Sequence, residues 1–168
     1  IDPQDCIGVF AFSGTYPTNK GTAVKVQRGW SVDDDTQLLG SPGEVYGNTV
    51  STRWGTYAQV SVANSGETVA GLLLYDCKEY DENGEKMIFN PRKFDELCAI
   101  PSGYTAPLVC KGLVLYSGVT GVVNAGDKAY LDDAGLLNVQ SKGSNTTVLG
   151  LFLGAKDSGG YALLKLNI

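Results

Sequence analysis

Polar and apolar residues alternate along much of the chain, as they do in half-buried β-strands. In Val24-Lys25-Val26-Gln27 the valines fall on one face and the polar residues on the other. Residues 58–62 (AQVSV) repeat the pattern. At the C-terminus one face would hold Ala162, Leu164, Leu166 and Ile168, and the other Tyr161, Leu163, Lys165 and Asn167. Each of these segments is therefore predicted to be a strand with two chemically different faces.

Three further runs are continuously apolar, at residues 72–75, 113–116 and 148–153. Strands of this kind are usually covered on both faces. We therefore expect a second sheet or a neighbouring subunit to cover each of them.

Short turn signals separate these runs, and a single segment is typical of a helix. The pair Asn83-Gly84 favours a tight hairpin turn. Asn90 is a suitable N-cap, and Pro91 suits the first helical turn. Apolar positions then recur with helical spacing at Phe94, Leu97 and Cys98. The pattern predicts one short helix at about residues 90–98.

The chain is therefore predicted to be all-β, a small β-barrel or sandwich with one short helix. Its composition changes near residue 64, from a segment rich in Thr, Ser, Gly and Trp to longer aliphatic strands. We interpret residues 1–64 as an N-terminal β-rich extension and residues 65–168 as the barrel.

The amino-acid composition excludes several kinds of catalytic and binding site. None of the 168 residues is histidine, which excludes Ser-His-Asp and Cys-His catalytic sites and histidine-ligated zinc within the chain. The net charge of −5 argues against nucleic-acid binding, because nucleic-acid binders usually carry a basic footprint. No apolar run approaches the roughly 18 residues of a membrane-spanning helix, so we expect no membrane partner.

No pattern of acidic residues or cysteines predicts a metal, a cofactor or a catalytic centre. The acidic run at residues 33–35 lacks the spaced ligands of a calcium loop and is interpreted as a solvated turn. No two carboxylates stand out as an acid–base pair, so we predict that the protein is not an enzyme. Four cysteines occur without any CxxC pair, at Cys6, Cys77, Cys98 and Cys110. Two disulfides are one interpretation; four reduced, largely buried thiols are the favoured one.

The most specific signal lies in the order of motifs over residues 65–168. Residues 126–135 read GDKAYLDDAG, residues 149–154 read LGLFLG, and residues 160–166 read GYALLKL. They follow the segments EKMIFNPR at residues 85–92 and PLVCKGLVLYS at residues 107–117. In this order they resemble the capsid decoration, or cement, proteins of tailed bacteriophages.

That resemblance implies a structural virion protein without catalytic residues. It would be made in the host bacterial cytoplasm and would bind the outer surface of an expanded capsid, bridging neighbouring subunits of the major capsid protein. It would act as a homo-oligomer, with a trimer favoured over a dimer. Several contacts made at once would raise its affinity through effective concentration.

Candidate contact residues lie in two parts of the chain. An extended N-terminal segment would add a strand to a capsid sheet edge, through Ile1, Asp2, Pro3, Gln4 and Asp5. Further candidates are Trp30, Trp54, Arg92 and Phe94. The alternative is a carbohydrate-binding or adhesin-like β module on a virion or cell surface, which would use the two tryptophans and nearby tyrosines.

Overall fold

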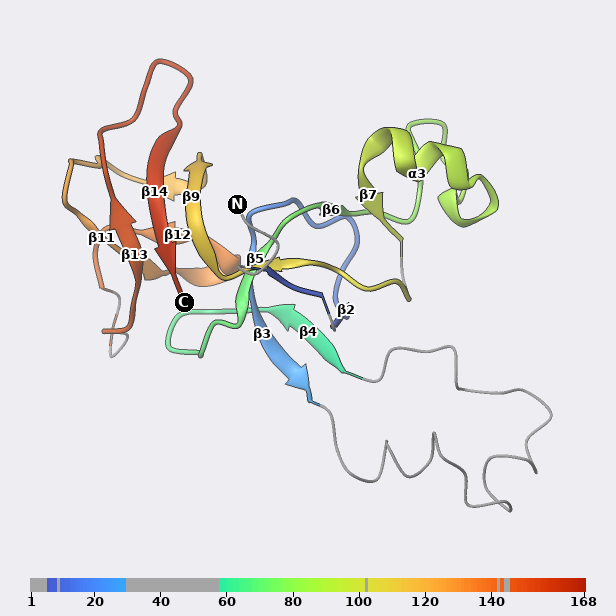
Figure 1. Cartoon of the computed structure of the whole chain (residues 1–168), viewed down its shortest axis with the longest axis horizontal. Coiled ribbons are helices and arrows are strands. Elements are labelled where there is room, and N and C mark those ends of the chain that lie inside the picture. The colour runs from blue at the N-terminus through green and yellow to red at the C-terminus, as the bar shows by residue number, and fades with distance from the viewer. Residues whose placement is uncertain (1–5, 9, 30–57, 102, 142, 144–145) are drawn as a thin grey trace.

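A computed structural model describes residues 6–8, 10–29, 58–101, 103–141, 143 and 146–168 (Figure 1). Its first six-stranded sheet has the order β1 (Cys6–Ile7), β8 (Leu108–Val109), β5 (Gly71–Leu73), β3 (Ala23–Arg28), β4 (Gln59–Val62) and β2 (Ala11–Phe12). The second six-stranded sheet has the order β10 (Val119–Thr120), β12 (Leu137–Asn138), β11 (Lys128–Leu131), β13 (Val148–Phe152), β14 (Ala162–Asn167) and β9 (Lys111–Tyr116). The all-β prediction is confirmed, with the second sheet curled into a half-barrel.

The centre of the first sheet is buried on both of its faces. Successive residues of β3, β5 and β8 alternate between two hydrophobic clusters. Ala23, Leu72 and Val109 pack into the cluster shared with the second sheet. Val24, Leu73 and Leu108 pack into the other cluster, with Phe12 and Val60. This two-sided burial confirms the prediction for Leu72 and Leu73, whereas Tyr75, at the end of the predicted run 72–75, is 40% exposed.

In the second sheet, only the inner face packs against other described residues. Along β14, Ala162, Leu164 and Leu166 are buried, whereas Leu163, Lys165 and Asn167 are exposed, which confirms the alternation predicted for the C-terminus. In β3, by contrast, Val24 is buried but Val26 is 48% exposed. A register shift lies between Val26 and Arg28, at the end of β3 where buried residues give way to exposed ones.

A small lobe is inserted between β5 and β8. It contains β6 (Asp76–Cys77), the 3-10 helix η2 (Met87–Phe89), the helix α3 (Pro91–Leu97) and β7 (Ala99–Ile100), and β6 pairs in parallel with β7. We call residues 76–101 the α3 lobe. The predicted short helix is confirmed. None of the helices in the described part of the chain is long and apolar enough to span a membrane.

The hairpin predicted at Asn83-Gly84 lies in this lobe. Tyr80 and Lys86 form an antiparallel bridge on its two sides. The Asp81 carboxylate accepts hydrogen bonds from the backbone N–H groups of Asn83 and Glu85, and Gly84 has the positive φ of 80° that the turn requires.

The first sheet takes strands from both sides of residue 64. β1 to β4 precede that position and β5 and β8 follow it, yet all six share one hydrogen-bonded sheet. β9 then continues directly from β8 into the second sheet. The two sheets share a core because Ala23 and Leu72 of the first pack with Phe152 and Leu164 of the second.

Candidate protein-binding surfaces

The outward face of β9, β14 and β13 carries two rows of large apolar side chains. Leu115 of β9 is opposite Leu163 of β14, whose carbonyl accepts a 2.9 Å hydrogen bond from the backbone N–H of Leu153. In the neighbouring row, Lys165 of β14 stands between Leu113 and Leu151. Side chains of paired residues point to the same side of a sheet, so each row crosses all three strands. We call the leucines at 113, 115, 151, 153 and 163, together with Lys165, the leucine face.

These leucines are unusually exposed for strand residues. Leu115 is 70% exposed and Leu113 is 57% exposed. With Tyr161 beside them, the five leucines expose roughly 600 Å² of mostly apolar surface, the size of the largest patch on a typical monomer, which often marks a binding site. The run at residues 113–116 was expected to be covered on both faces. The described residues of one copy cover it on the inner face alone.

Charge on the second sheet is entirely positive. Its six strands contain Lys111, Lys128 and Lys165 and no acidic residue. All three lysines are exposed, and none forms an ion pair with any described residue. A basic, apolar face on a chain of net charge −5 favours a partner that is acidic and apolar.

The α3 lobe has the opposite character. Residues 76–101 include seven acidic and four basic side chains. The lobe also exposes Tyr80 (51%), Ile88 (49%), Phe89 (84%) and Leu97 (41%). It is therefore acidic and apolar.

Two of the hollows at the surface of the lobe combine apolar and charged side chains. The larger, of about 430 Å³, is lined by apolar and aromatic residues (Tyr16, Pro17, Tyr80 and Leu97), by the acidic residues Glu79, Asp81 and Glu82, and by Lys78. The smaller, of about 190 Å³, is lined by Glu79, Lys86, Ile88 and Pro101. Each hollow combines apolar walls with at least one carboxylate.

Part of the acidity of the lobe is neutralised internally. Lys93 donates a hydrogen bond to Glu82, and this bond lowers the pKa of the Glu82 carboxyl and raises that of Lys93. Lys78 lies 3.4 Å from an Asp76 carboxylate oxygen. The carboxylates that form no ion pair with any described residue include Glu79, Glu85, Asp95 and Glu96. The lobe thus keeps carboxylates free for an external cation.

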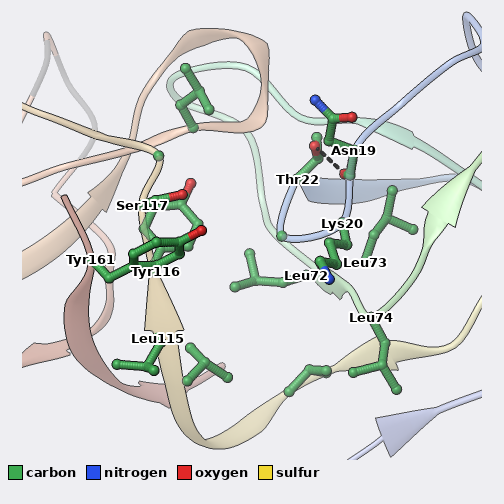
Figure 2. A pocket seen from close by; sticks show the side chains of 15 residues that line it. Asn19, Lys20, Thr22, Leu72, Leu73, Leu74, Leu115, Tyr116, Ser117 and Tyr161 are labelled. Atoms are coloured by element: carbon green, nitrogen blue, oxygen red, sulfur yellow. Dashed lines mark hydrogen bonds between the residues drawn. The ribbon is translucent and has the colours of Figure 1, made fainter. Parts of the chain in front are cut away.

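A pocket of about 370 Å³ opens where the two sheets diverge (Figure 2). Tyr116 and Tyr161 line one side, and Lys20 and Leu72 line the other. The Tyr116 side chain is 6% exposed, and its hydroxyl oxygen is closed off from solvent. A Cβ on Gly118 would lie 2.7 Å from that oxygen, so the absent side chain at Gly118 leaves room for the ring. The pocket thus presents mainly the edge of the ring and aliphatic walls, not the hydroxyl.

Tyr116→Phe is expected to change the free energy of unfolding by less than about 0.5 kcal/mol at neutral pH. The hydroxyl makes no standard hydrogen bond with any described residue, so the variant loses none. Burial raises the pKa of Tyr116 to about 12, although the Leu137 backbone lowers it slightly.

This raised pKa also predicts a pH dependence. The phenol ionises near pH 10 in the unfolded chain and later in the folded one, so its contribution to stability is complete below pH 10 and lost as the pH rises toward 12. Urea titrations of both proteins from pH 8 to pH 11 test this. The wild type should lose more stability than Tyr116→Phe; equal losses would contradict it.

All four cysteines are free thiols, as favoured from the sequence. Cys77 is buried, and Cys6 and Cys110 are partly buried, but Cys98 is exposed, so the expectation of largely buried thiols is wrong for Cys98. It directly follows the last residue of α3 and has a positive φ of 48°. No group of three or more potential metal ligands of the Cys, Asp and Glu types occurs in the described ranges.

Thiol labelling should therefore separate Cys98 from Cys77. Burial, reinforced by the nearby Asp76 charge, raises the pKa of Cys77 to about 11, which leaves very little thiolate near pH 8. With iodoacetamide and peptide mass spectrometry, we expect Cys98 to be modified at least ~10-fold faster than Cys77. In denaturant the two rates should converge; similar rates in the native protein would contradict this.

Most contact residues predicted from the sequence lie outside the described residues. These are Ile1, Asp2, Pro3, Gln4, Asp5, Trp30 and Trp54. Arg92 is exposed on α3, and Phe94 belongs to the same helix, although its side chain is not described. The leucine face was not predicted as a site. The sequence feature that pointed to it was the apolar run at residues 113–116, because a continuously apolar strand is expected to be covered on both faces.

No family model matches the chain, and no curated protein matches it significantly.

Proposed function

We propose that the protein is a structural component of a phage virion, which binds the outside of the expanded capsid and bridges neighbouring subunits of the major capsid protein. The observation that supports this most is the presence of two apolar surfaces at opposite ends of one small β protein. The leucine face lies on β9, β13 and β14, and the exposed aromatic and aliphatic residues of the α3 lobe lie at the other end (Figure 1). A bridging protein needs two separated contact surfaces, because it must hold two neighbours at once.

The chemistry of these surfaces suits a binding role. The leucine face combines leucines with lysines, and the α3 lobe combines aromatic residues with carboxylates. Interfaces of this kind gain affinity from buried apolar anchors and orientation from the charges around them. Many modest contacts repeated over a shell hold tightly because each bound contact raises the effective concentration of the next.

Addition of the purified protein to expanded heads that lack it tests the proposal. We expect saturable binding, measured by co-sedimentation and by cryo-electron microscopy of the particles, and greater resistance of the decorated heads to heat. Val122→Glu is the surface control, since Val122 is 79% exposed in the turn after β10.

The result that would overturn the proposal is an absence of binding to expanded heads by folded protein. A glycan array then identifies the alternative class, because a carbohydrate-binding module would retain specific glycans and leave the heads undecorated.

A further inference from the structure

We propose that the leucine face of one copy binds the α3 lobe of a second copy, so that the chains associate head to tail. The occupant of each surface is thus the other surface of an identical chain. The contact is heterologous, because two different patches meet.

The two surfaces cannot meet within one molecule. Figure 1 places β9, β13 and β14 at one end of the molecule and α3 at the other. The leucine face has its inner side filled by the shared core, in which Phe152 and Leu164 are fully buried, so the exposed leucines cannot turn inward. No described segment of the same chain covers them, so a second molecule is the partner that we assign.

The shapes of the two surfaces are complementary. Leu115 and Leu113 are the most exposed leucines of the face and project from an edge strand, since β9 pairs with β14 alone among the described strands. The 430 Å³ hollow on the α3 lobe has apolar walls at Tyr16, Tyr80 and Leu97. A leucine side chain occupies well under half of that volume, so the hollow has room for one or two.

The charges are complementary as well. Lys111 and Lys165 flank the exposed leucines. The hollow is bordered by three carboxylates, Glu79, Asp81 and Glu82, and by a single cation, Lys78, which pairs with Asp76. Opposite charges around an apolar centre favour this pairing and fix its orientation. A contact between two leucine faces would instead bring lysines of both copies together, and no acidic residue lies on the strands of that sheet to neutralise them.

The surface area of the leucine face is sufficient for a specific interface between two copies. An apolar centre of roughly 600 Å² on the leucine face, extended by a polar rim, approaches the ~800 Å² per partner of a standard specific interface. In a heterologous contact, each copy is related to the next by the same rotation. The copies close into a ring when that rotation is a whole-number fraction of a full turn. A ring leaves no leucine face uncovered.

This inference assigns to a second copy the two surfaces that the proposed function offers to the capsid, so the two compete for the same residues. In a ring, the bridging role rests on the surfaces that the oligomer leaves exposed. The two are nevertheless separable. Self-association is measured on purified protein without capsids, whereas decoration is measured on heads. A monomer that still decorates heads overturns the head-to-tail contact and leaves the proposed function standing.

The first experiment is sedimentation velocity and equilibrium on the full chain over about 1–100 µM, the range in which contacts of this size dissociate. We expect a closed oligomer for the wild type and for Val122→Glu. Leu115→Glu places a charge in the apolar centre and adds repulsion from the acidic lobe. Leu97→Glu buries a carboxylate in the apolar centre from the other side of the contact. Each should raise the dissociation constant at least ~30-fold, with the circular dichroism spectrum unchanged.

Mixing the two variants identifies the symmetry. In a head-to-tail contact, Leu115→Glu retains an intact lobe and Leu97→Glu an intact leucine face, so an equimolar mixture should form a one-to-one dimer. If Leu97→Glu associates as well as the wild type, the lobe is not part of the contact and the inference is overturned. A monomeric wild type at the highest concentration overturns it too.

Ionic strength provides an independent measurement. Raising NaCl from about 0.05 M to about 0.5 M screens the lysine–carboxylate attraction, so the dissociation constant should rise. Tighter association at high salt would overturn the role of charge, because a purely apolar contact is not weakened by screening.

Discussion

Gly150→Ala is expected to destabilise the protein by about 3 kcal/mol, as an overpacked strand does. Gly150 lies in β13 opposite Leu166 of β14. A Cβ at this position would lie 2.4 Å from the backbone oxygen of Lys165 and 3.3 Å from the Cα of Leu166. Backbone atoms cannot rotate away as a side chain can, so β13 and β14 would have to move apart. Urea denaturation followed by circular dichroism measures the loss.

Gly154 is the matched control for this prediction. It follows the same strand, and a Cβ on it would meet no atom within 4 Å. Gly154→Ala should therefore change the free energy of unfolding by no more than about 0.5 kcal/mol. Equal effects of the two substitutions would contradict the close approach of β13 and β14 at Gly150.

Phe152→Ala is expected to cost about 4 kcal/mol, which is typical of removing a buried phenylalanine from a core. Phe152 is 0% exposed and packs in the cluster that joins the two sheets. Its backbone N–H donates to the Asp127 carbonyl and its carbonyl accepts from Gly126, so the chain on either side is held in place. A cavity at this position therefore cannot close by a local shift, and denaturant titration should show the full loss.

Leu151→Ala provides the comparison in the adjacent residue. Leu151 belongs to the leucine face and is 37% exposed. At micromolar protein or below, its truncation should cost about 1–2 kcal/mol, well below the cost of Phe152→Ala, because 37% of its surface stays in water within one copy. If Leu151→Ala were as destabilising as Phe152→Ala, the two faces of β13 would be equally buried, which would contradict an outward leucine face.

The leucine face illustrates how an alternating strand pattern leaves apolar side chains outside the core. The core of the second sheet is complete within one chain, with Leu137, Phe152 and Leu164 fully buried. The outward leucines add nothing to that core, and their exposure works against solubility. Their placement on three adjacent strands, with lysines beside them, makes sense for a contact between molecules.

The sequence by itself determined the local features of this protein. Which side chains of β14 point into the core was predicted, because side chains alternate with a period of two in any strand. The helix at Pro91–Leu97 was predicted because its cap, its proline and its apolar spacing lie within a few residues of one another. The turn at Asn83-Gly84 depended on one glycine with a positive φ. Each of these features depends on short-range sterics and hydrogen bonds.

Only the tertiary structure decided which apolar runs are covered and where the charges gather. The runs at residues 72–75 and 113–116 look alike in the sequence, yet Leu72 and Leu73 are buried between two clusters while Leu113 and Leu115 face outward. The difference arises because β5 packs into hydrophobic clusters on both faces of its sheet, whereas only one face of β9 packs into such a cluster. Burial depends on pairing between residues far apart in the chain, and no local period encodes that pairing.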